Sequence, residues 1–361
     1  MAQEKHLSDL EAVQRLKNAY EQLRAELRKA IIGQEKVLEQ LLTCIFAKGH
    51  GLLIGVPGLA KTLMVRTVAQ TLSLSFNRIQ FTPDLMPADI TGTEVIQEDR
   101  STGQRCLQFI KGPVFSNVIL ADEINRTPPK TQAALLEAMQ ELQVTCGGRK
   151  YTLEEPFFVL ATQNPIEQEG TYPLPEAQLD RFMFNIMVDY PTENEELEIM
   201  KLTTSSFNIQ LDKVLSREEI LQLQEIVRRV PIADHVINYA MALARQTRVH
   251  PSIESGLPAN VPEFIREWVA WGAGPRASQY LIIGAKAHAI LQGRYYVSTD
   301  DIKAVAYPVL RHRIITNFSA EAEGITTDKI IDKLIEITPV DESELSRNGR
   351  LPKVLGSARS E

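Results

Sequence analysis

Residues 55–62 combine a glycine-rich turn with a lysine and a hydroxyl at the start of a predicted helix. An apolar run precedes the turn, and the segment itself consists of Gly55, Val56, Pro57, Gly58, Leu59, Ala60, Lys61 and Thr62. A strand, such a turn and then Lys-Thr opening a helix can cradle phosphate groups with backbone N–H donors. We therefore predict a phosphate site at which Lys61 neutralises negative charge and Thr62 binds Mg²⁺.

Ala60 stands where the strict form of this pattern has its second glycine. A positive φ at this position would cost alanine about 1–2 kcal/mol, because its Cβ would crowd the next carbonyl oxygen. A negative φ would make the methyl group harmless. The sequence leaves these two alternatives open.

An acidic pair follows the apolar residues 118–121, a continuous run that is typical of a buried parallel strand. In open α/β sheets, ligands bind beyond the carboxyl ends of the strands. We expect Asp122 to hold Mg²⁺ through water, because this ion keeps several waters and takes few protein carboxylates. Glu123 is then suited to act as a general base toward an attacking water. The alternative is a solvated acidic strand end.

Two further polar residues adjoin later strand patterns. Asn164 follows an apolar run, where its amide could contact a terminal phosphate or orient water, although by itself it also fits a turn before Pro165. Arg181 precedes the apolar residues 182–188 and could stabilise charge on a transferring phosphoryl group, including one bound by a neighbouring subunit. The alternative for Arg181 is a surface ion pair with the adjacent Asp180.

Taken together, these motifs resemble the MoxR branch of the AAA+ ATPases. The resemblance extends from about residue 31 to about residue 334, and its seven ordered motifs are residues 55–62, 80–85, 121–126, 161–165, 174–182, 274–278 and 310–314. By this resemblance, Asn164 is the sensor 1 residue, Arg181 the arginine finger and Arg276 the sensor 2 arginine. Ile32 and Gly33 match the segment that packs against adenine. Alanine at position 60 is common in this family, and whether Arg276 serves its own or a neighbouring subunit stays open.

The resemblance implies Mg²⁺-dependent ATP hydrolysis by a homo-oligomer, expected to be a hexameric ring, with ATP and Mg²⁺ as cofactors. It also implies a chaperone-like output, either remodelling or metal-cofactor activation of a client, often with a partner that carries a von Willebrand factor A domain. A nucleotide-gated scaffold with little turnover remains an alternative. A DNA-acting AAA+ motor would need a basic pore or a DNA-binding module, and a GTPase switch would need an Asn-Lys-x-Asp motif; the sequence indicates none of these.

The composition fits an ordinary globular protein. The 361 residues suffice for two domains, and the net charge of −7 disfavours nucleic acid as a partner. The N-terminal residues show no signal segment and no apolar stretch approaches about 18 residues, so we expect a cytoplasmic protein without a membrane span. Three cysteines without metal-type spacing fit a reducing compartment.

Patterning divides the chain into four expected regions. Residues 1–29 predict one amphipathic helix that packs against the core, since apolar residues recur at three- and four-residue steps. Residues 30–191 alternate strand and helix patterns, which predicts an α/β fold, the doubly wound parallel sheet of a P-loop AAA+ core. Residues 192–340 predict an α-helical lid domain, in which Ser216 with Glu219 and Ser298 with Asp301 are expected to cap helices. Residues 341–361 are expected to form a flexible tail.

Two inserted β-hairpins interrupt the core pattern, one near residues 93–110 and the other near residues 144–153, each with turn residues at its centre. Contact with a substrate or partner and plain surface decoration are equally weighted interpretations. In the lid, Trp268 and Trp271 are three residues apart, which predicts that both lie on one helix face and pack in the core.

Overall fold

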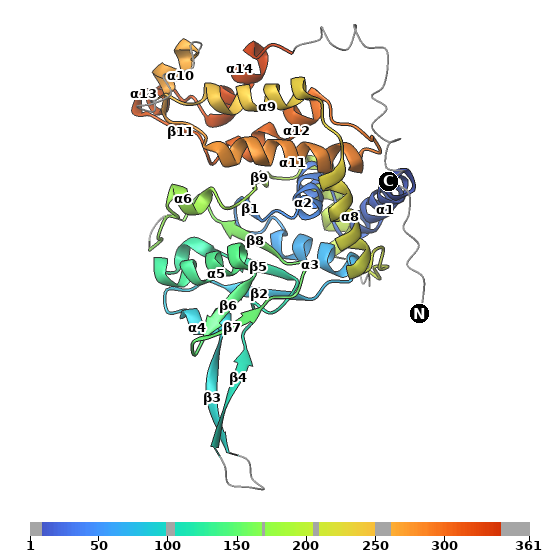
Figure 1. Ribbon diagram of the computed structural model, residues 1–361, viewed down its shortest axis with the longest axis vertical. Helices are drawn as coiled ribbons and strands as arrows, with labels where there is room; N and C mark the ends of the chain where they lie inside the picture. The colour runs from blue at the N-terminus through green and yellow to red at the C-terminus, as the bar shows by residue number, and fades with distance from the viewer. Residues whose placement is uncertain (1–8, 99–104, 168–169, 205–208, 250–260, 341–361) are drawn as a thin grey trace, which may run out of the picture.

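The computed structural model describes residues 9–98, 105–167, 170–204, 209–249 and 261–340 of the chain. A parallel sheet with helices on both faces forms one body, and a layer of helices from the C-terminal half packs above it (Figure 1). The predicted fold class, an α/β ATPase core followed by a helical lid, is confirmed. The predicted boundaries at residues 29/30, 191/192 and 340/341 stay predictions, and the tail lies outside the described residues.

Five strands make up the central sheet, and all of their pairings are parallel. Its spatial order is β2-β5-β8-β1-β9. Parallel strands under helices on both faces read as continuous apolar runs, and β5 is buried along its whole length. The carboxyl ends of β1, β5 and β8 therefore meet at one edge. The strand bounds are β1 Gly51–Ile54, β2 Phe76–Gln80, β5 Val118–Asp122, β8 Phe158–Gln163 and β9 Phe184–Met187.

The sheet separates two hydrophobic cores, because successive side chains of a strand point to opposite faces. Ile119 and Ala121 of β5 join one core with helix α5, whereas Val118 and Leu120 join the other core with helices α2 and α3 and the lid. The elements around the sheet are α1 Asp9–Ala30, α2 Glu35–Phe46, α3 Lys61–Thr71, α4 Pro87–Thr91, the 3₁₀ turn η1 Ile124–Arg126, α5 Pro129–Glu141 and α6 Glu176–Leu179.

Helix α1 packs along α3 of the core and along two lid helices, α8 (Arg217–Arg229) and α11 (Pro275–Leu291). Leu16, Leu23 and Leu27 are fully buried in this contact, at the spacing of one helix face. Their burial explains why an amphipathic helix precedes the sheet in the sequence, because its apolar face covers the α/β core and the helical lid at the same time.

Both expected hairpins are present. Strands β3 (Gly92–Glu98) and β4 (Arg105–Lys111) form a long antiparallel arm that projects away from the sheet in Figure 1, and its predicted turn lies outside the described residues. Strands β6 (Gln143–Cys146) and β7 (Arg149–Thr152) form the second, shorter hairpin. Phe109 of β4 stacks on Tyr151 of β7 with ring centroids 4.0 Å apart, which joins the two hairpins.

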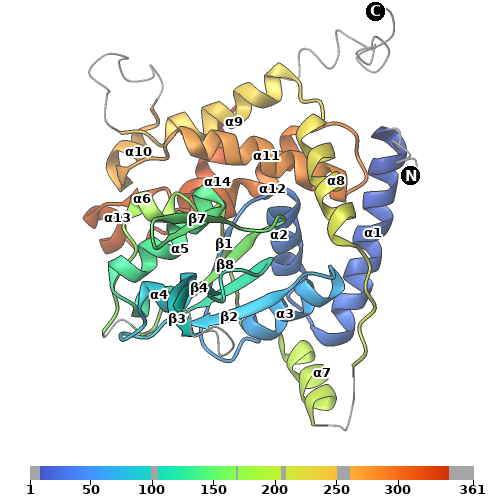
Figure 2. The ribbon, with the colours of Figure 1, turned by 60° about the horizontal axis from the view of Figure 1, so that its bottom comes forward.

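The lid consists mainly of helices. Capping boxes begin α8 at Ser216 and α12 at Ser298, as the sequence predicts. Helix α7 stands apart from the other lid helices and near α3 in Figure 2. The bounds are α7 Glu193–Thr203, α8 Arg217–Arg229, α9 Asp234–Gln246, α10 Glu263–Trp268, α11 Pro275–Leu291, α12 Thr299–Leu310, α13 Phe318–Ala322 and α14 Thr327–Ile337.

The predicted helix face shared by the two tryptophans is wrong. Helix α10 ends at Trp268, and the chain continues as strand β10 (Val269–Trp271), which pairs antiparallel with β11 (Ile315–Thr316). Trp268 is 8% exposed, but Trp271 is 61% exposed. The pairing partner lies more than forty residues downstream, so a local periodicity could not reveal the strand.

Among the described residues, no helix combines the length and hydropathy needed to cross a membrane.

Candidate nucleotide site

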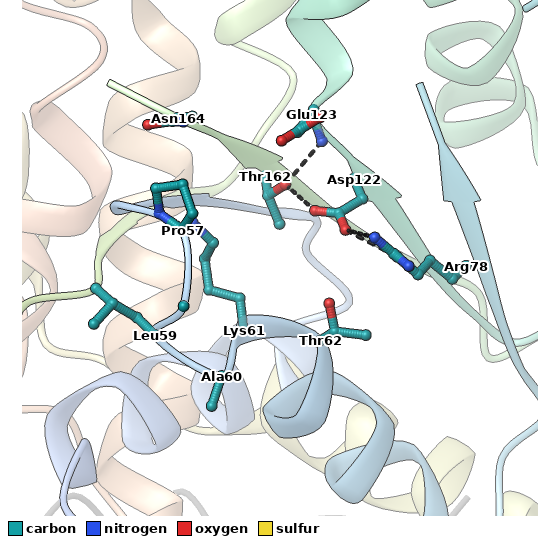
Figure 3. Close-up of a pocket in the computed structure, with 11 residues that line it drawn as sticks. Pro57, Leu59, Ala60, Lys61, Thr62, Arg78, Asp122, Glu123, Thr162 and Asn164 are labelled. Carbon is teal, nitrogen blue, oxygen red and sulfur yellow. Dashed lines mark hydrogen bonds and ion pairs between the residues drawn. The ribbon is translucent and has the colours of Figure 1, made fainter. Parts of the chain in front are cut away.

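A cavity of about 380 Å³ opens where the carboxyl ends of β1, β5 and β8 meet (Figure 3). Most of the predicted phosphate-site residues line it, and two residues that the sequence analysis did not single out, Arg78 and Thr162, line it as well. The lining residues are Pro57, Gly58, Leu59, Ala60, Lys61, Thr62, Arg78, Asp122, Glu123, Thr162 and Asn164. Gly55 and Val56 of the predicted phosphate site are not among them.

The loop between β1 and α3 depends on its glycines for different reasons. Gly58 has a φ of 86°, in the left-handed region that glycine adopts without cost. At Gly55 a Cβ would lie 2.6 Å from the carbonyl oxygen of Val188, so only glycine lets β9 approach. Ala60 has a φ of 54° and a ψ of 23°. Of the two alternatives for Ala60, the positive φ is therefore the one present, with a strain of about 1–2 kcal/mol.

The Lys61 ammonium folds back over its own loop. It donates to the carbonyl oxygen of Val56 at 3.1 Å and also to that of Gly55. Partial burial lowers the pKa of Lys61, although the carboxylates of Asp122 and Glu123 act in the opposite direction. The amine therefore lies among anionic groups at the floor of the cavity, where it can exchange carbonyl contacts for phosphate contacts.

Thr162 connects the two members of the acidic pair (Figure 3). Its hydroxyl donates to Asp122 Oδ1 at 2.6 Å and accepts from the backbone N–H of Glu123 at 2.9 Å. Thr162 is 1% exposed, so water does not compete for these bonds. Asp122 is itself buried, which is inconsistent with a solvated acidic strand end.

Arg78 of β2 holds the other oxygen of the same carboxylate. Its Nε and Nη2 donate to Asp122 Oδ2 at 2.9 and 2.6 Å. Gln80, two residues further along β2, donates from Nε2 to Glu123 Oε2 at 2.9 Å. Arg126 Nε lies 3.0 Å from that same oxygen of Glu123. Each acid is thus oriented by a donor from β2, and Arg126 provides a second contact to Glu123 at the same oxygen.

Glu123 has a φ of 57° and a ψ of 50°, the left-handed conformation that a non-glycine residue adopts at a cost. The strand ends at Asp122, and this turn directs Glu123 into the cavity rather than along the sheet. The position of strain at the end of β5 agrees with the general tendency of strained residues to occur at functional sites.

Asn164 combines the two interpretations that the sequence allows. Its Oδ1 accepts from the backbone N–H of Ile166 at 3.1 Å, which is a local turn contact. Its Nδ2 is buried and has no hydrogen-bond partner among the described residues, although the residue lines the cavity. A buried unpaired donor is costly unless a ligand or water accepts from it. This orphaned donor is suited to a phosphate oxygen or an ordered water.

A second cavity of about 350 Å³ adjoins the first and shares residues 57–60 with it. Its lining is largely apolar and includes Ile31, Ile32, Leu63, Tyr190 and Met200. An apolar cavity that continues into a polar one matches the shape of a nucleotide, with its base in the apolar cavity and its phosphates in the polar cavity.

Gly33 lies beside this apolar cavity but does not line it. Its φ is 67°, and a Cβ would lie 2.5 Å from Glu195 Oε1. The next residue, Gln34, donates from Nε2 to the carbonyl oxygen of Asp189 at 2.7 Å. The segment around Ile32 is therefore tied to the chain that leaves β9 and enters α7.

Neither Arg181 nor Arg276 lines the two cavities of this chain. Arg276 Nη1 lies 3.1 Å from Asp180 Oδ2, and Arg313 Nε lies 2.7 Å from Asp180 Oδ1. Arg181 makes no ion pair with a described residue, so the alternative of a surface pair between Asp180 and Arg181 is not what the structure contains. Arg276 thus pairs with the residue directly before Arg181, and neither arginine is among the lining residues of the cavities.

Sequence analysis missed four residues that surround the acidic pair: Arg78, Gln80, Arg126 and Thr162. One signal was available, since Arg78 and Gln80 are two apart in a strand and therefore point to the same face. The pairing of β2 with β5, which brings that face to the acids, depends on sheet order and is not visible in a local pattern.

The fold and the cavity define a P-loop ATPase with a helical lid. Comparison with known families gives the same class: residues 50–184 match the ATPase family associated with various cellular activities (AAA), and residues 264–334 match the AAA lid domain.

Comparison with individual proteins identifies the family of AAA ATPases to which the chain belongs. The chain is 43% identical to Chaperone MoxR1 of Mycobacterium tuberculosis over 86% of this chain and 79% of that protein. It is 41% identical to protein YeaC of Bacillus subtilis over 87% and 92% of the two chains. A crystal structure of a protein from Cytophaga hutchinsonii matches with a TM-score of 0.82 at 45% identity, over 91% and 97% of the chains. The chain belongs to the MoxR family of AAA+ ATPases, as its motifs predict.

Proposed function

We propose that this protein hydrolyses ATP with Mg²⁺ as an oligomeric ring, expected to be a hexamer, and uses the cycle to remodel or activate a client protein. One observation carries this proposal. A polar cavity with Lys61, Thr62 and Asp122 continues into an apolar cavity beside Ile32, which together suit the phosphates and base of one nucleotide.

The residues present fit ATP and Mg²⁺. Thr62 and Asp122 supply hydroxyl and carboxylate oxygens, the ligands that Mg²⁺ prefers. The loop before α3 and the buried Nδ2 of Asn164 supply donors for phosphate oxygens. Bound Mg²⁺ would neutralise charge that develops on the phosphate oxygens.

Proton transfer would fall to Glu123. Its carboxylate faces the cavity from a strained turn, held by Gln80 and Arg126, and can accept a proton from water. Asn164 would orient that water from the end of β8. Lys61 would exchange the carbonyl groups of its own loop for phosphate oxygens.

The ring would complete each site between subunits. The position of Arg181 and Arg276 away from the cavities of their own chain supports a role at the site of a neighbour, as an arginine finger supplied in trans. The same surface of each subunit then meets a different surface of the next, a head-to-tail contact that closes into a ring.

The proposed client is another protein. The chaperone named among the relatives supports a chaperone-like output, and a partner with a von Willebrand factor A domain in the cytoplasm is the expected setting. The projecting arm formed by β3 and β4 offers a surface for such a partner, with Ile96 and Leu107 opposite each other and both mostly exposed. Nucleic acid is not expected as a partner.

A nucleotide-gated scaffold is the second candidate. One observation favours it: Arg78 forms an ion pair with Asp122, and Arg126 forms one with Glu123. Such contacts would slow ATP turnover while leaving nucleotide binding intact.

Glu123→Gln separates the two candidates. Hydrolysis by the wild-type protein under single-turnover conditions, lost in Glu123→Gln while a fluorescent ATP analogue still binds, supports the enzyme. Equal phosphate release by both proteins would remove Glu123 as the base. No release by either protein, at any concentration, would favour the scaffold.

A further inference from the structure

Three consecutive residues at the end of lid helix α12 hold the chain that carries Arg181. Arg311, His312 and Arg313 all donate to backbone carbonyl groups between residues 180 and 185. His312 Nε2 donates to the carbonyl oxygen of Phe182 at 3.0 Å, and Arg311 Nη1 to that of Asn185 at 3.5 Å. The lid therefore binds the backbone directly on the C-terminal side of Arg181.

Arg313 makes most of these contacts. Its Nη2 donates to the carbonyl oxygens of Asp180 at 2.9 Å and Phe182 at 2.7 Å, the residues on either side of Arg181. Its Nη1 donates to the carbonyl oxygen of Met183 at 3.3 Å, and its Nε to the Asp180 carboxylate at 2.7 Å. The guanidinium is almost completely buried, so water does not compete for these bonds.

Tyr280 of helix α11 contacts the finger residue itself. Its hydroxyl lies 3.4 Å from the carbonyl oxygen of Arg181, and its ring lies 5.0 Å from the guanidinium of Arg313. Arg276, one turn before Tyr280, pairs with the same Asp180 carboxylate that Arg313 binds. Two lid helices thus meet on the three residues 180–182.

We infer that Arg313, with Tyr280, is a positioning residue for Arg181: it fixes the arginine finger to the lid, so that the lid of one subunit sets the finger geometry at the site of the next. The inference rests on the proposed role of Arg181 in trans. The backbone on both sides of Arg181 is bonded to the lid, whereas the Arg181 side chain makes no ion pair with the described residues. A shift of the lid would therefore move the finger with it.

A positioning role for Arg313 can be told apart from a role in folding by the rate of ATP hydrolysis. An Arg313→Lys substitution keeps the charge and the apolar stem but cannot bond several carbonyl groups in a fixed plane. A finger displaced by about 1 Å costs on the order of 10²-fold in rate. Because the substituted subunit retains its own cavity, it should work wherever a neighbour supplies an intact finger.

Mixed rings test this expectation. Lys61→Ala subunits lack a working phosphate site but carry an intact Arg181. Mixed with Arg313→Lys subunits in equal amounts, they should restore ATP hydrolysis to about one quarter of the wild-type rate, since one interface in four then joins a working site to a working finger. Arg181→Ala mixed with Lys61→Ala should behave in the same way. The double substitution Arg181→Ala/Arg313→Lys should be no slower than Arg181→Ala alone.

Arg294→Lys is the matched control. Arg294 also pairs with a buried aspartate of the lid, Asp301, but it contacts no residue from 180 to 185. It should lower stability without creating a defect that Lys61→Ala subunits restore. Tyr280→Phe is the milder second variant; it removes one bond to Arg181 and should reduce the rate by less than Arg313→Lys, with the same restoration.

The possible results distinguish a failure of the inference about Arg313 from a failure of the proposed arginine finger in trans. A wild-type rate of ATP hydrolysis by Arg313→Lys rings of normal mass overturns the inference. A second outcome also overturns it: Lys61→Ala subunits restore hydrolysis to Arg181→Ala subunits but not to Arg313→Lys subunits. Failure to restore Arg181→Ala itself overturns the finger in trans, and the inference with it. If Arg313→Lys does not fold, Tyr280→Phe decides by the same criteria.

Discussion

Arg78 is the cation with which a bound Mg²⁺ would have to compete at Asp122. Its guanidinium bonds Asp122 Oδ2 over 2.9 and 2.6 Å, while its side chain is 48% exposed. Two charge-assisted bonds could contribute a few kcal/mol in a dry site, but exposure and screening reduce the pair to about 1 kcal/mol. Since 1.4 kcal/mol corresponds to a factor of ten, we expect Arg78→Gln to tighten Mg²⁺ binding about fivefold.

The assay is a Mg²⁺ titration of protein loaded with a fluorescent ADP analogue. Without Mg²⁺, Arg78→Gln should bind the analogue more weakly, because a positive charge beside the phosphates is lost. Arg126→Gln is the control, since Arg126 holds Glu123 rather than Asp122. An unchanged or weaker Mg²⁺ affinity in Arg78→Gln would refute the competition, and so would an equal tightening in Arg126→Gln.

Three further predictions concern strain, charge and surface. Ala60→Gly should raise the free energy of unfolding by about 0.5–1 kcal/mol in urea titrations, because relief of the positive φ outweighs the added freedom of the unfolded chain; a lower midpoint would contradict this. Burial opposes a charged His288, but hydrogen bonds to Asp301 and Glu39 outweigh it and raise the pKa of His288 to about 9. The stabilisation of roughly 1–3 kcal/mol is therefore complete below about pH 6.5 and lost as the pH rises through about 9, and His288→Gln should remove this slope from urea unfolding; an identical slope in both proteins would count against it. Serine at both Ile96 and Leu107 should leave basal ATP hydrolysis unchanged and weaken binding of casein, an unfolded probe, whereas equal binding would make the arm a decoration.

The sequence predicts the fold class and the loop from residue 55 to residue 62 because both depend on local signals. Continuous apolar runs mark the buried strands, and the glycine-containing loop that leads into Lys61-Thr62 follows the first of them directly. The capping residues Ser216 and Ser298 predict helix starts correctly for the same reason, since a cap needs only its own next three residues.

What the sequence could not predict depends on contacts between distant segments. From the sequence, Thr162 is only a residue of a predicted strand. Its hydroxyl reaches Asp122 because β8 pairs with β5, and the local sequence does not show this pairing. The ion pairs of Asp180 are a second case, because Arg276 and Arg313 reach it from the lid, 96 and 133 residues downstream. The conformation of Ala60 differs from these cases, because it is a local property of the loop for which the sequence allowed either sign of φ.

We propose that each ATP site is completed by a neighbouring subunit. The most direct test measures the ATP hydrolysis rate per subunit against protein concentration, with Mg²⁺ and no partner, while light scattering reports the mass of the particles. Completion of each site between subunits predicts a rate that rises and saturates together with assembly of the ring. An appreciable rate that stays flat over concentrations at which the particles are single subunits would contradict it.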